Sequence, residues 1–129
     1  MSNKKRLVCI VDDDVDILNL YYDALKGTTG IKLFKFSDPL MALEHIRINK
    51  NSYALIISDL RMPELNGIDL IKKVKTLNNN IRSILVTAFD VTDIGIEEHR
   101  EKKVLNGFIQ KPIKITELRS VVKDQLQEV

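Results

Sequence analysis

The chain of 129 residues carries a net charge of +2, with 44% hydrophobic and 29% charged residues. This length corresponds to about one domain, so we expect residues 1–129 to form a single one. Basic residues gather only in two short runs, 4–6 and 72–75, which argues against a dedicated nucleic-acid binder. The apolar runs are too short for a secretion signal or for the ~20 residues of a membrane span. With a single cysteine, Cys9, in an apolar run, these features predict a soluble protein of the reducing cytoplasm.

The first third of the chain predicts two strands and two helices. Residues 7–11 form an unbroken apolar run, typical of a buried strand, which ends at three aspartates. The last of these, Asp14, is predicted to cap a helix whose apolar residues recur at helical spacing up to Gly27. Residues 31–36 alternate apolar side chains with lysines, as a half-exposed strand does, and a second helix follows at 39–47.

The middle of the chain contains its most distinctive stretch. Residues 53–58 are apolar and rich in isoleucine, and they end abruptly at Asp59, with Pro63 and Gly67 at turn-forming positions after it. This pattern predicts a buried strand that delivers Asp59 to a loop. The remaining predicted elements are, in order, a helix at 68–78, a strand at 81–87, a thinly apolar helix at 90–103, a strand at 108–110 and a helix with its apolar stripe at 118–126.

Five strands that alternate with five helices predict an α/β fold. Its sheet is expected to be parallel and doubly wound, because each crossover helix must lie on a face of the sheet. Among such arrangements we expect the flavodoxin-like strand order 2-1-3-4-5. This order places the first and third strands side by side at the switch point, where ligands bind beyond the carboxyl ends of the strands.

Five polar residues are expected to meet at that edge of the sheet. Asp12 and Asp13 follow the first strand, and Asp59 ends the third. Thr87 ends the fourth strand and Lys111 follows the fifth. The carboxyl ends of parallel strands lie at one edge, so the topology predicts that these residues form one site.

The chemistry of these residue types indicates a cation and a phosphoryl group. Two carboxylates ~4 Å apart repel each other by about 4 kcal/mol at a protein surface, so their clustering calls for a cation. Hard oxygen ligands with room for water suit Mg²⁺. Lys111 is placed to neutralise a phosphoryl group, and Thr87 to hydrogen-bond one of its oxygens. Asp59 is then the predicted nucleophile, which would form a reversible acyl phosphate.

At this point the sequence resembles a known family, the receiver domains of two-component response regulators. The resemblance covers essentially the whole chain, and the joint match is far more specific than any one of its parts. Its motifs, each at the end of a predicted strand, are Val11-Asp12-Asp13-Asp14, Asp59-Leu60-Arg61-Met62-Pro63 with Gly67, Thr87-Ala88 and Phe108-Ile109-Gln110-Lys111-Pro112.

The resemblance implies a role for each residue of the site. Asp59 is expected to accept a phosphoryl group from a phosphohistidine on a histidine kinase or a histidine phosphotransfer protein. Mg²⁺ would be bound by Asp13, Asp59 and the backbone carbonyl of Arg61, with Asp12 holding a metal-bound water. Lys111 would pair with Asp59 before transfer and with the phosphoryl group afterwards.

The resemblance also implies a conformational switch. Thr87 would move toward the phosphoryl group, and Phe108 would turn inward and change the surface that a downstream protein recognises. The chain departs from the family pattern in two places. Val104 and Leu105 stand where many relatives have Gly-Ala, and Phe108 replaces a commoner tyrosine.

Two alternative functions remain open on the sequence. An aspartate-nucleophile phosphatase also combines α/β architecture, Mg²⁺ and an acyl phosphate, but that family places its nucleophile after the first strand and needs a cap or substrate pocket. A degenerate receiver would serve only as a binding module, which the complete set of site residues argues against. The predicted function is therefore a phosphorylation-switched receiver without a separate metabolic substrate, acting through an unidentified protein target.

Several residues outside the motifs have simpler interpretations. His45 and His99 lie on predicted helices without a second metal ligand at suitable spacing, and we expect both at the surface. Ile17 and Leu20 lie off the apolar stripe of the first helix, either as scattered surface residues or as a contact for a partner helix. The proline after Lys111 allows a cis peptide bond that would aim the lysine inward.

Overall fold

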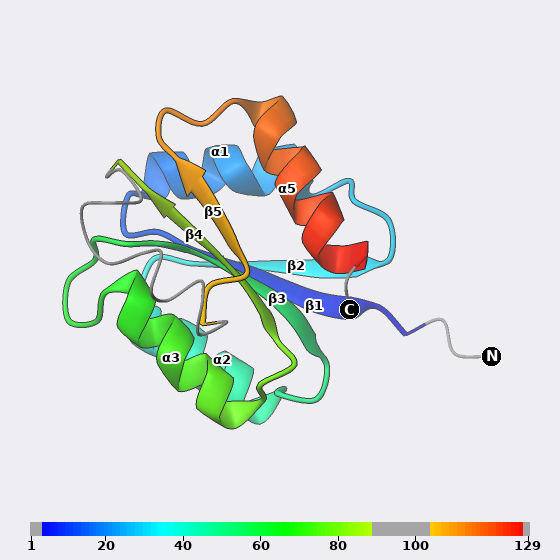
Figure 1. The fold of residues 1–129 in the computed structure, drawn as a ribbon, viewed down its shortest axis with the longest axis vertical. Helices are drawn as coiled ribbons and strands as arrows, with labels where there is room; N and C mark the ends of the chain where they lie inside the picture. Colours follow the sequence, from blue (N-terminus) through cyan, green and yellow to red (C-terminus); the bar gives the residue numbers. More distant parts are fainter. Residues whose placement is uncertain (1–3, 89–103, 128–129) are drawn as a thin grey trace.

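The computed structural model describes residues 4–88 and 104–127. The strands are β1 (Arg6–Val11), β2 (Ile31–Phe36), β3 (Tyr53–Asp59), β4 (Arg82–Thr87) and β5 (Gly107–Gln110). The helices are α1 (Val15–Leu25), α2 (Pro39–Ile48), α3 (Gly67–Leu77) and α5 (Ile115–Gln127). All five strands pair in parallel in the order β2-β1-β3-β4-β5, which confirms the predicted α/β fold and strand order (Figure 1). The helix predicted at 90–103 lies outside the described residues.

The sheet separates two apolar cores. Helices α1 and α5 cover one face, and α2 and α3 cover the other (Figure 1). Because side chains alternate along a strand, Val8 and Ile10 of β1 pack under α1 and α5, whereas Cys9 and Val11 pack under α2 and α3. Both faces of the central strands are therefore buried, which explains why their sequences are continuous apolar runs.

Three of the helices have a polar side chain at the N-cap position. The carboxylate of Asp14 accepts hydrogen bonds from the backbone N–H groups at the start of α1, as predicted. Asp38 caps α2 in the same way, with Pro39 as its first residue. Asn66 caps α3. These caps fix where each loop at the carboxyl edge of the sheet ends.

His45 is not the surface residue that the sequence predicted. Its ring is half-buried, with its centroid 4.5 Å from that of Phe34 and 5.4 Å from that of Phe36, both in β2. Its Nδ1 lies 2.7 Å from the hydroxyl of Tyr53. Helical periodicity alone could not reveal this packing, because the aromatic partners come from two other elements. His99 lies outside the described residues.

Ile17 and Leu20, which lie off the apolar stripe of α1, differ in burial. Ile17 is partly buried and packs against the core under α1 and α5, whereas Leu20 is 54% exposed. Only Leu20 therefore fits the interpretation of a scattered apolar surface residue. Because the side chain of Ile17 is already used in packing, it offers less free apolar area to a partner.

A polar network holds together the end of the sheet opposite the predicted site. The side-chain oxygen of Asn106 accepts hydrogen bonds from Lys75 Nζ of α3 (2.8 Å) and from the backbone N–H of Ser83 of β4 (2.9 Å). Its backbone carbonyl accepts one from Gln125 Nε2 of α5 (3.1 Å). Gln125 in turn accepts two from the guanidinium of Arg82. One residue before β5 thus connects both layers of helices to the sheet.

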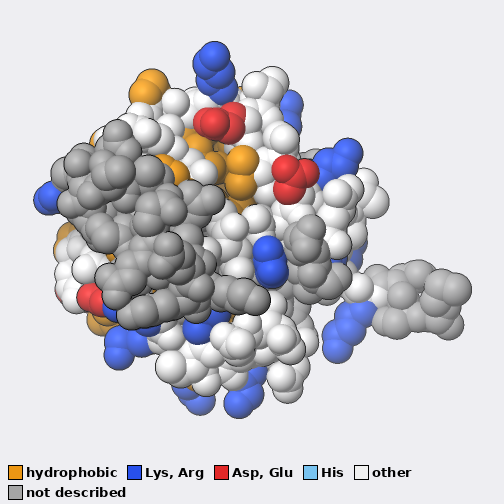
Figure 2. Space-filling model, in the orientation of Figure 1, with side chains coloured by type: hydrophobic (Ala, Val, Ile, Leu, Met, Phe, Trp, Pro, Cys, Tyr) orange, Lys and Arg blue, Asp and Glu red, His pale blue; other side chains and the backbone are white. Residues whose placement is uncertain are grey.

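The described part of the chain contains no helix that is both long enough and apolar enough to span a bilayer. On the face shown in Figure 2, most lysine and arginine side chains lie apart from one another near the margin. A continuous basic surface is not visible on this face.

Candidate functional site

The sheet topology brings the five predicted residues to one edge. Asp12 and Asp13 directly follow β1, and Asp59 is the last residue of β3. Thr87 is the last residue of β4, and Lys111 follows β5. The strands are in register at this edge, with Asp59 beside β4 and Thr87 beside β5. The prediction that these side chains share the carboxyl edge is therefore confirmed.

Three carboxylates form a compact cluster at this edge. One oxygen from each of Asp12, Asp13 and Asp59 lies within 4.8 Å of the others. Asp12 and Asp59 are buried, whereas Asp13 is exposed. Like charges at such distances repel strongly where water is largely excluded, so the arrangement is favourable for a bound cation.

Lys111 places a positive charge beside the carboxylate cluster. Its Nζ lies 3.0 Å from Asp59 Oδ1 and 3.9 Å from Asp12 Oδ2. Burial alone would lower the pKa of Lys111, but its hydrogen bond to Asp59 and the charge of that carboxylate raise it overall, so the side chain is a cation at neutral pH. Its backbone N–H donates to the carbonyl of Thr87 (2.8 Å), and the Lys111–Pro112 peptide bond is cis.

The Asp12 carboxylate is only half satisfied. Its Oδ1 accepts a hydrogen bond from the backbone N–H of Asp14 (2.9 Å), but Oδ2 has no hydrogen-bond partner within the described segments. Burial raises the pKa of Asp12 to about 6, and the charge of Asp59 adds to this effect, while the Asp14 bond and the Lys111 charge act against it. A buried carboxylate oxygen that accepts no hydrogen bond, with Lys111 Nζ 3.9 Å away, is available to a bound water or metal ion.

The loop after β3 is tied down on both sides of Asp59. The backbone N–H of Leu60 donates to the carbonyl of Val86 in β4 (3.0 Å), and that of Gly67 donates to the carbonyl of Leu60 (2.8 Å). A Cβ atom at Gly67 would overlap the backbone carbonyl oxygen of Asp59, so only glycine fits there. The sequence identified Gly67 as a turn former but did not reveal this contact with Asp59, because the contact depends on how α3 lies against β3.

The remaining predicted residues lie around the cluster. Arg61 is exposed and, with Asp13, lines an open depression of about 660 Å³ beside the carboxylates. Thr87 is 2% exposed, so its hydroxyl lies below the surface of the site. Phe108 is only half-buried and packs against the core under α2 and α3. Phe108 therefore retains exposed area in this structure.

Comparison with protein families decides the identity of this arrangement. Residues 8–123 match the family model described as the response regulator receiver domain. The chain belongs to this family. The receiver is 33% identical to Sporulation initiation phosphotransferase F of Bacillus subtilis over 126 residues, which are 98% of this chain and 96% of that protein. It is 27% identical to Transcriptional regulatory protein ZraR of Klebsiella oxytoca, of whose length it covers only 27%.

Solved structures of receiver domains superimpose on this chain even where sequence identity is low. A response regulator receiver domain from Clostridium thermocellum superimposes with a TM-score of 0.83 at 22% identity, over 95% of both chains. The receiver domain of a Francisella response regulator superimposes with a TM-score of 0.79 at 31% identity, over 96% of this chain and 98% of that one. The family match and the fold therefore agree.

Proposed function

We propose that residues 1–129 form a single receiver domain that accepts a phosphoryl group on Asp59 from a phosphohistidine of a histidine kinase or a histidine phosphotransfer protein. The observation that carries the proposal is the ion pair between Lys111 Nζ and Asp59 Oδ1, beside a cluster of three carboxylates. A cation held 3.0 Å from the acceptor oxygen can neutralise the charge of an incoming phosphoryl group.

The donor set fits Mg²⁺. The ion prefers one or two carboxylates and retains several waters, and the cluster offers exposed Asp13, buried Asp59 and Oδ2 of Asp12, which accepts no hydrogen bond in the described segments. We assign Asp13, Asp59 and the backbone carbonyl of Arg61 as direct ligands, and Asp12 as the holder of a metal-bound water. When bound, Mg²⁺ supplies charge neutralisation for the phosphoryl oxygens.

The chain's own residues then have defined roles. An Asp59 carboxylate oxygen forms a bond to phosphorus as the phosphorus–nitrogen bond of the donor breaks, and the imidazole leaves with the electron pair of that bond and takes up a proton from water. Lys111 stabilises the charge on the transferred group, and the hydroxyl of Thr87 donates to one of its oxygens. Water later attacks phosphorus and releases inorganic phosphate, which restores the Asp59 carboxylate.

The output is proposed to be a protein contact. Thr87 moves toward the phosphoryl group, Phe108 turns inward, and the surface around β5 and α5 changes for an unidentified downstream protein. The named phosphotransferase among its relatives supports a place in phosphoryl relay. The buried free thiol of Cys9 supports a reducing cytoplasmic location.

Phosphoramidate tests the proposal directly, because it carries the same phosphorus–nitrogen bond as phosphohistidine. The protein is incubated with Mg²⁺ and phosphoramidate, and the added phosphoryl group is measured by intact mass. Beryllofluoride is added in parallel while amide NMR signals are followed. We expect phosphorylation and spectral change in the wild-type protein, and neither in Asp59→Asn. Asp124→Asn makes the same chemical change on exposed α5, and we expect it to behave as wild type.

Three outcomes would contradict the proposal. No response to either reagent would indicate a module that only binds. Multiple turnover of phosphate esters would indicate a phosphatase. Equal phosphorylation of Asp59→Asn and the wild-type protein would place the acceptor elsewhere.

A further inference from the structure

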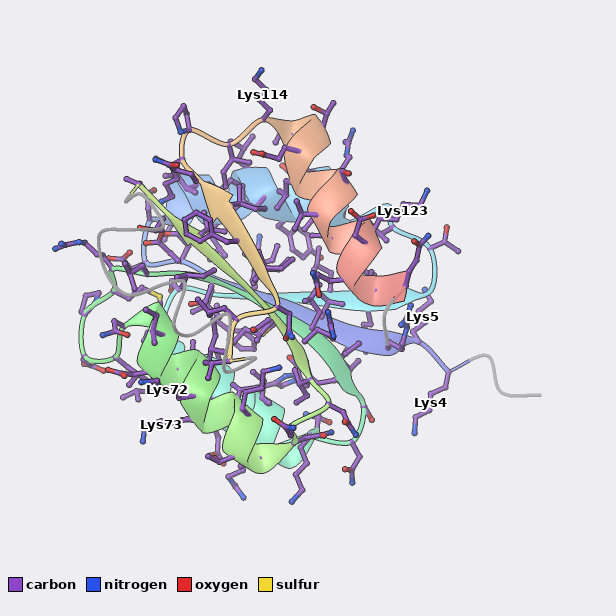
Figure 3. All side chains as sticks on the ribbon, in the orientation of Figure 1. Lys4, Lys5, Lys72, Lys73, Lys114 and Lys123 are labelled. Carbon is purple, nitrogen blue, oxygen red and sulfur yellow. The ribbon has the colours of Figure 1, made fainter. Side chains whose placement is uncertain are left out.

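A groove lies at the end of the molecule opposite Asp59, between the end of α1 with the loop after it and residues 119–127 of α5. Its volume is about 760 Å³. Four of the side chains that line it are cationic, namely Arg6, Lys26, Arg119 and Lys123. In Figure 3, Lys123 and Lys5, next to Arg6 in the chain, extend from this same end of the molecule. None of these residues takes part in the phosphorylation site.

The two arginines are held in place by the helix ends. Arg6 Nη1 donates to the backbone carbonyl of Leu126 in α5 (2.8 Å), and Arg119 Nε donates to that of Ala24 in α1 (2.9 Å). Each guanidinium uses a single nitrogen in these bonds, and its other N–H groups have no partner within residues 4–88 and 104–127. A side chain that is already fixed before a ligand binds loses less conformational entropy on binding, which favours the complex.

The cations exceed what the fold needs to balance its own charges. Among the residues that the structure describes, Asp23 is the one carboxylate lining the groove, and it pairs with Lys26 at 3.3 Å. The carbonyl ends of α1 and α5 add roughly half a negative charge each. Counted over residues 4–88 and 104–127 alone, these leave an excess of about two positive charges, and Lys123 forms no ion pair with any of those residues. Capping of the two helices therefore does not account for all four cations.

The form of the groove favours a peptide over a small anion. Its floor is apolar: Ala24 is partly buried, and beneath it Val122 and Leu126 are 1% and 6% exposed. Most of the other lining residues are exposed, whereas sites for small molecules enclose roughly 70–90% of the ligand surface. A bilayer surface would not enter a concave groove. An open groove between two helices, apolar below and basic at its rim, is suited to an extended or helical segment that combines apolar and acidic side chains.

We infer that this α1–α5 groove docks an acidic, apolar-bearing segment of a partner protein, on a surface separate from the phosphorylation site. Arg119 and Lys123 lie one helical turn apart on α5, so they can pair with two carboxylates spaced by one turn on a docked helix. The apolar side chains of that segment contact the floor. The fixed arginines give the segment a defined position along the groove.

A display library of random 16-residue peptides, selected against the full wild-type chain without phosphodonor, tests the inference. We expect the enriched peptides to be acidic and to contain leucine, isoleucine or phenylalanine. The most enriched peptide should shift amide NMR signals of residues 24–29 and of α5. Its affinity is measured for Lys123→Glu and for Lys72→Glu, which makes the same charge change on α3, on the other side of the sheet (Figure 3).

Lys123→Glu is expected to weaken binding about tenfold, and Lys72→Glu less than about twofold. The inference is overturned if no peptide is enriched, if the enriched peptides are neutral or basic, or if both variants weaken binding equally. It is also overturned if phosphatidylglycerol vesicles bind more tightly than the peptide and lose binding in Lys123→Glu, since the occupant would then be a membrane. The selection does not involve Asp59, so its failure leaves the phosphorylation proposal unaffected.

Discussion

Gly67 packs so closely against Asp59 that a Cβ atom at residue 67 would overlap the Asp59 carbonyl oxygen. Gly67→Ala must therefore displace either the end of β3 or the start of α3. We expect it to lower the free energy of unfolding by about 1–3 kcal/mol and to slow phosphorylation by misplacing the acceptor. Urea denaturation measures the first effect. Gly27→Ala is the control, because a Cβ there meets nothing within 4 Å, and it should not destabilise the protein.

Replacement of Lys111 separates its electrostatic role from folding. Lys111→Met keeps the length of the side chain but removes the cation 3.0 Å from Asp59. We expect phosphorylation by phosphoramidate to slow by about 100-fold, the order of loss when one preorganised donor is removed. Single-turnover mass measurements give the rate. Lys114→Met, three residues later and exposed, should retain the wild-type rate; equal slowing in both variants would refute the assignment.

The hydroxyl of Thr87 is expected to matter more than its methyl group. Thr87→Val preserves shape at this buried position and removes one hydrogen bond to the bound group. A bond worth about 1 kcal/mol corresponds to an affinity for beryllofluoride about fivefold weaker. The amide signal of Phe108 should also respond less. Thr87→Ser keeps the hydroxyl and should behave nearly as wild type, and a larger loss in Thr87→Ser than in Thr87→Val would exclude this role.

Lys75 makes stability depend on pH in the alkaline range. Burial, with a smaller contribution from the charge of Arg82, lowers the pKa of Lys75 to about 8. The unfolded chain then holds this proton more tightly than the folded one between pH 8 and about 10.5, so the folded state gains stability as pH rises through that window. From pH 7 to 9.5 the gain is about 2 kcal/mol.

The difference between wild type and Lys75→Met isolates this effect. Urea denaturation at both pH values gives the free energy of unfolding of each protein, and titration of all other groups cancels in the comparison. The free energy of unfolding of the wild type, minus that of Lys75→Met, should increase with pH. A difference that stays constant or shrinks would show that Lys75 titrates normally in the fold.

Much of the fold and of the site followed from local patterns. Asp14 and Pro39 predicted where α1 and α2 begin, because capping and proline geometry depend only on neighbouring residues. The meeting of Asp59 and Lys111 followed from strand order, since parallel strands end at one edge. These predictions needed no knowledge of side-chain packing.

Side-chain contacts between elements far apart in the chain could not be predicted from the sequence. His45 packs on Phe34 and Phe36 across two elements, and no periodicity on α2 reveals this. The bonds of Asn106 reach residues 31 and 23 positions earlier, in α3 and β4. Such contacts depend on how helices and strands are placed against one another, which the sequence pattern of a single element does not specify.

The strand order also has a consequence for synthesis. The first strand to leave the ribosome, β1, lies inside the sheet, and β2 and β3 then add to its two sides. After that, β4 and β5 each extend the same growing edge. Every new strand therefore finds a paired neighbour that has already been made, and no strand has to be inserted between two others. A nascent chain can assemble this sheet in the order of translation, with Lys111, which completes the proposed phosphorylation site, arriving last.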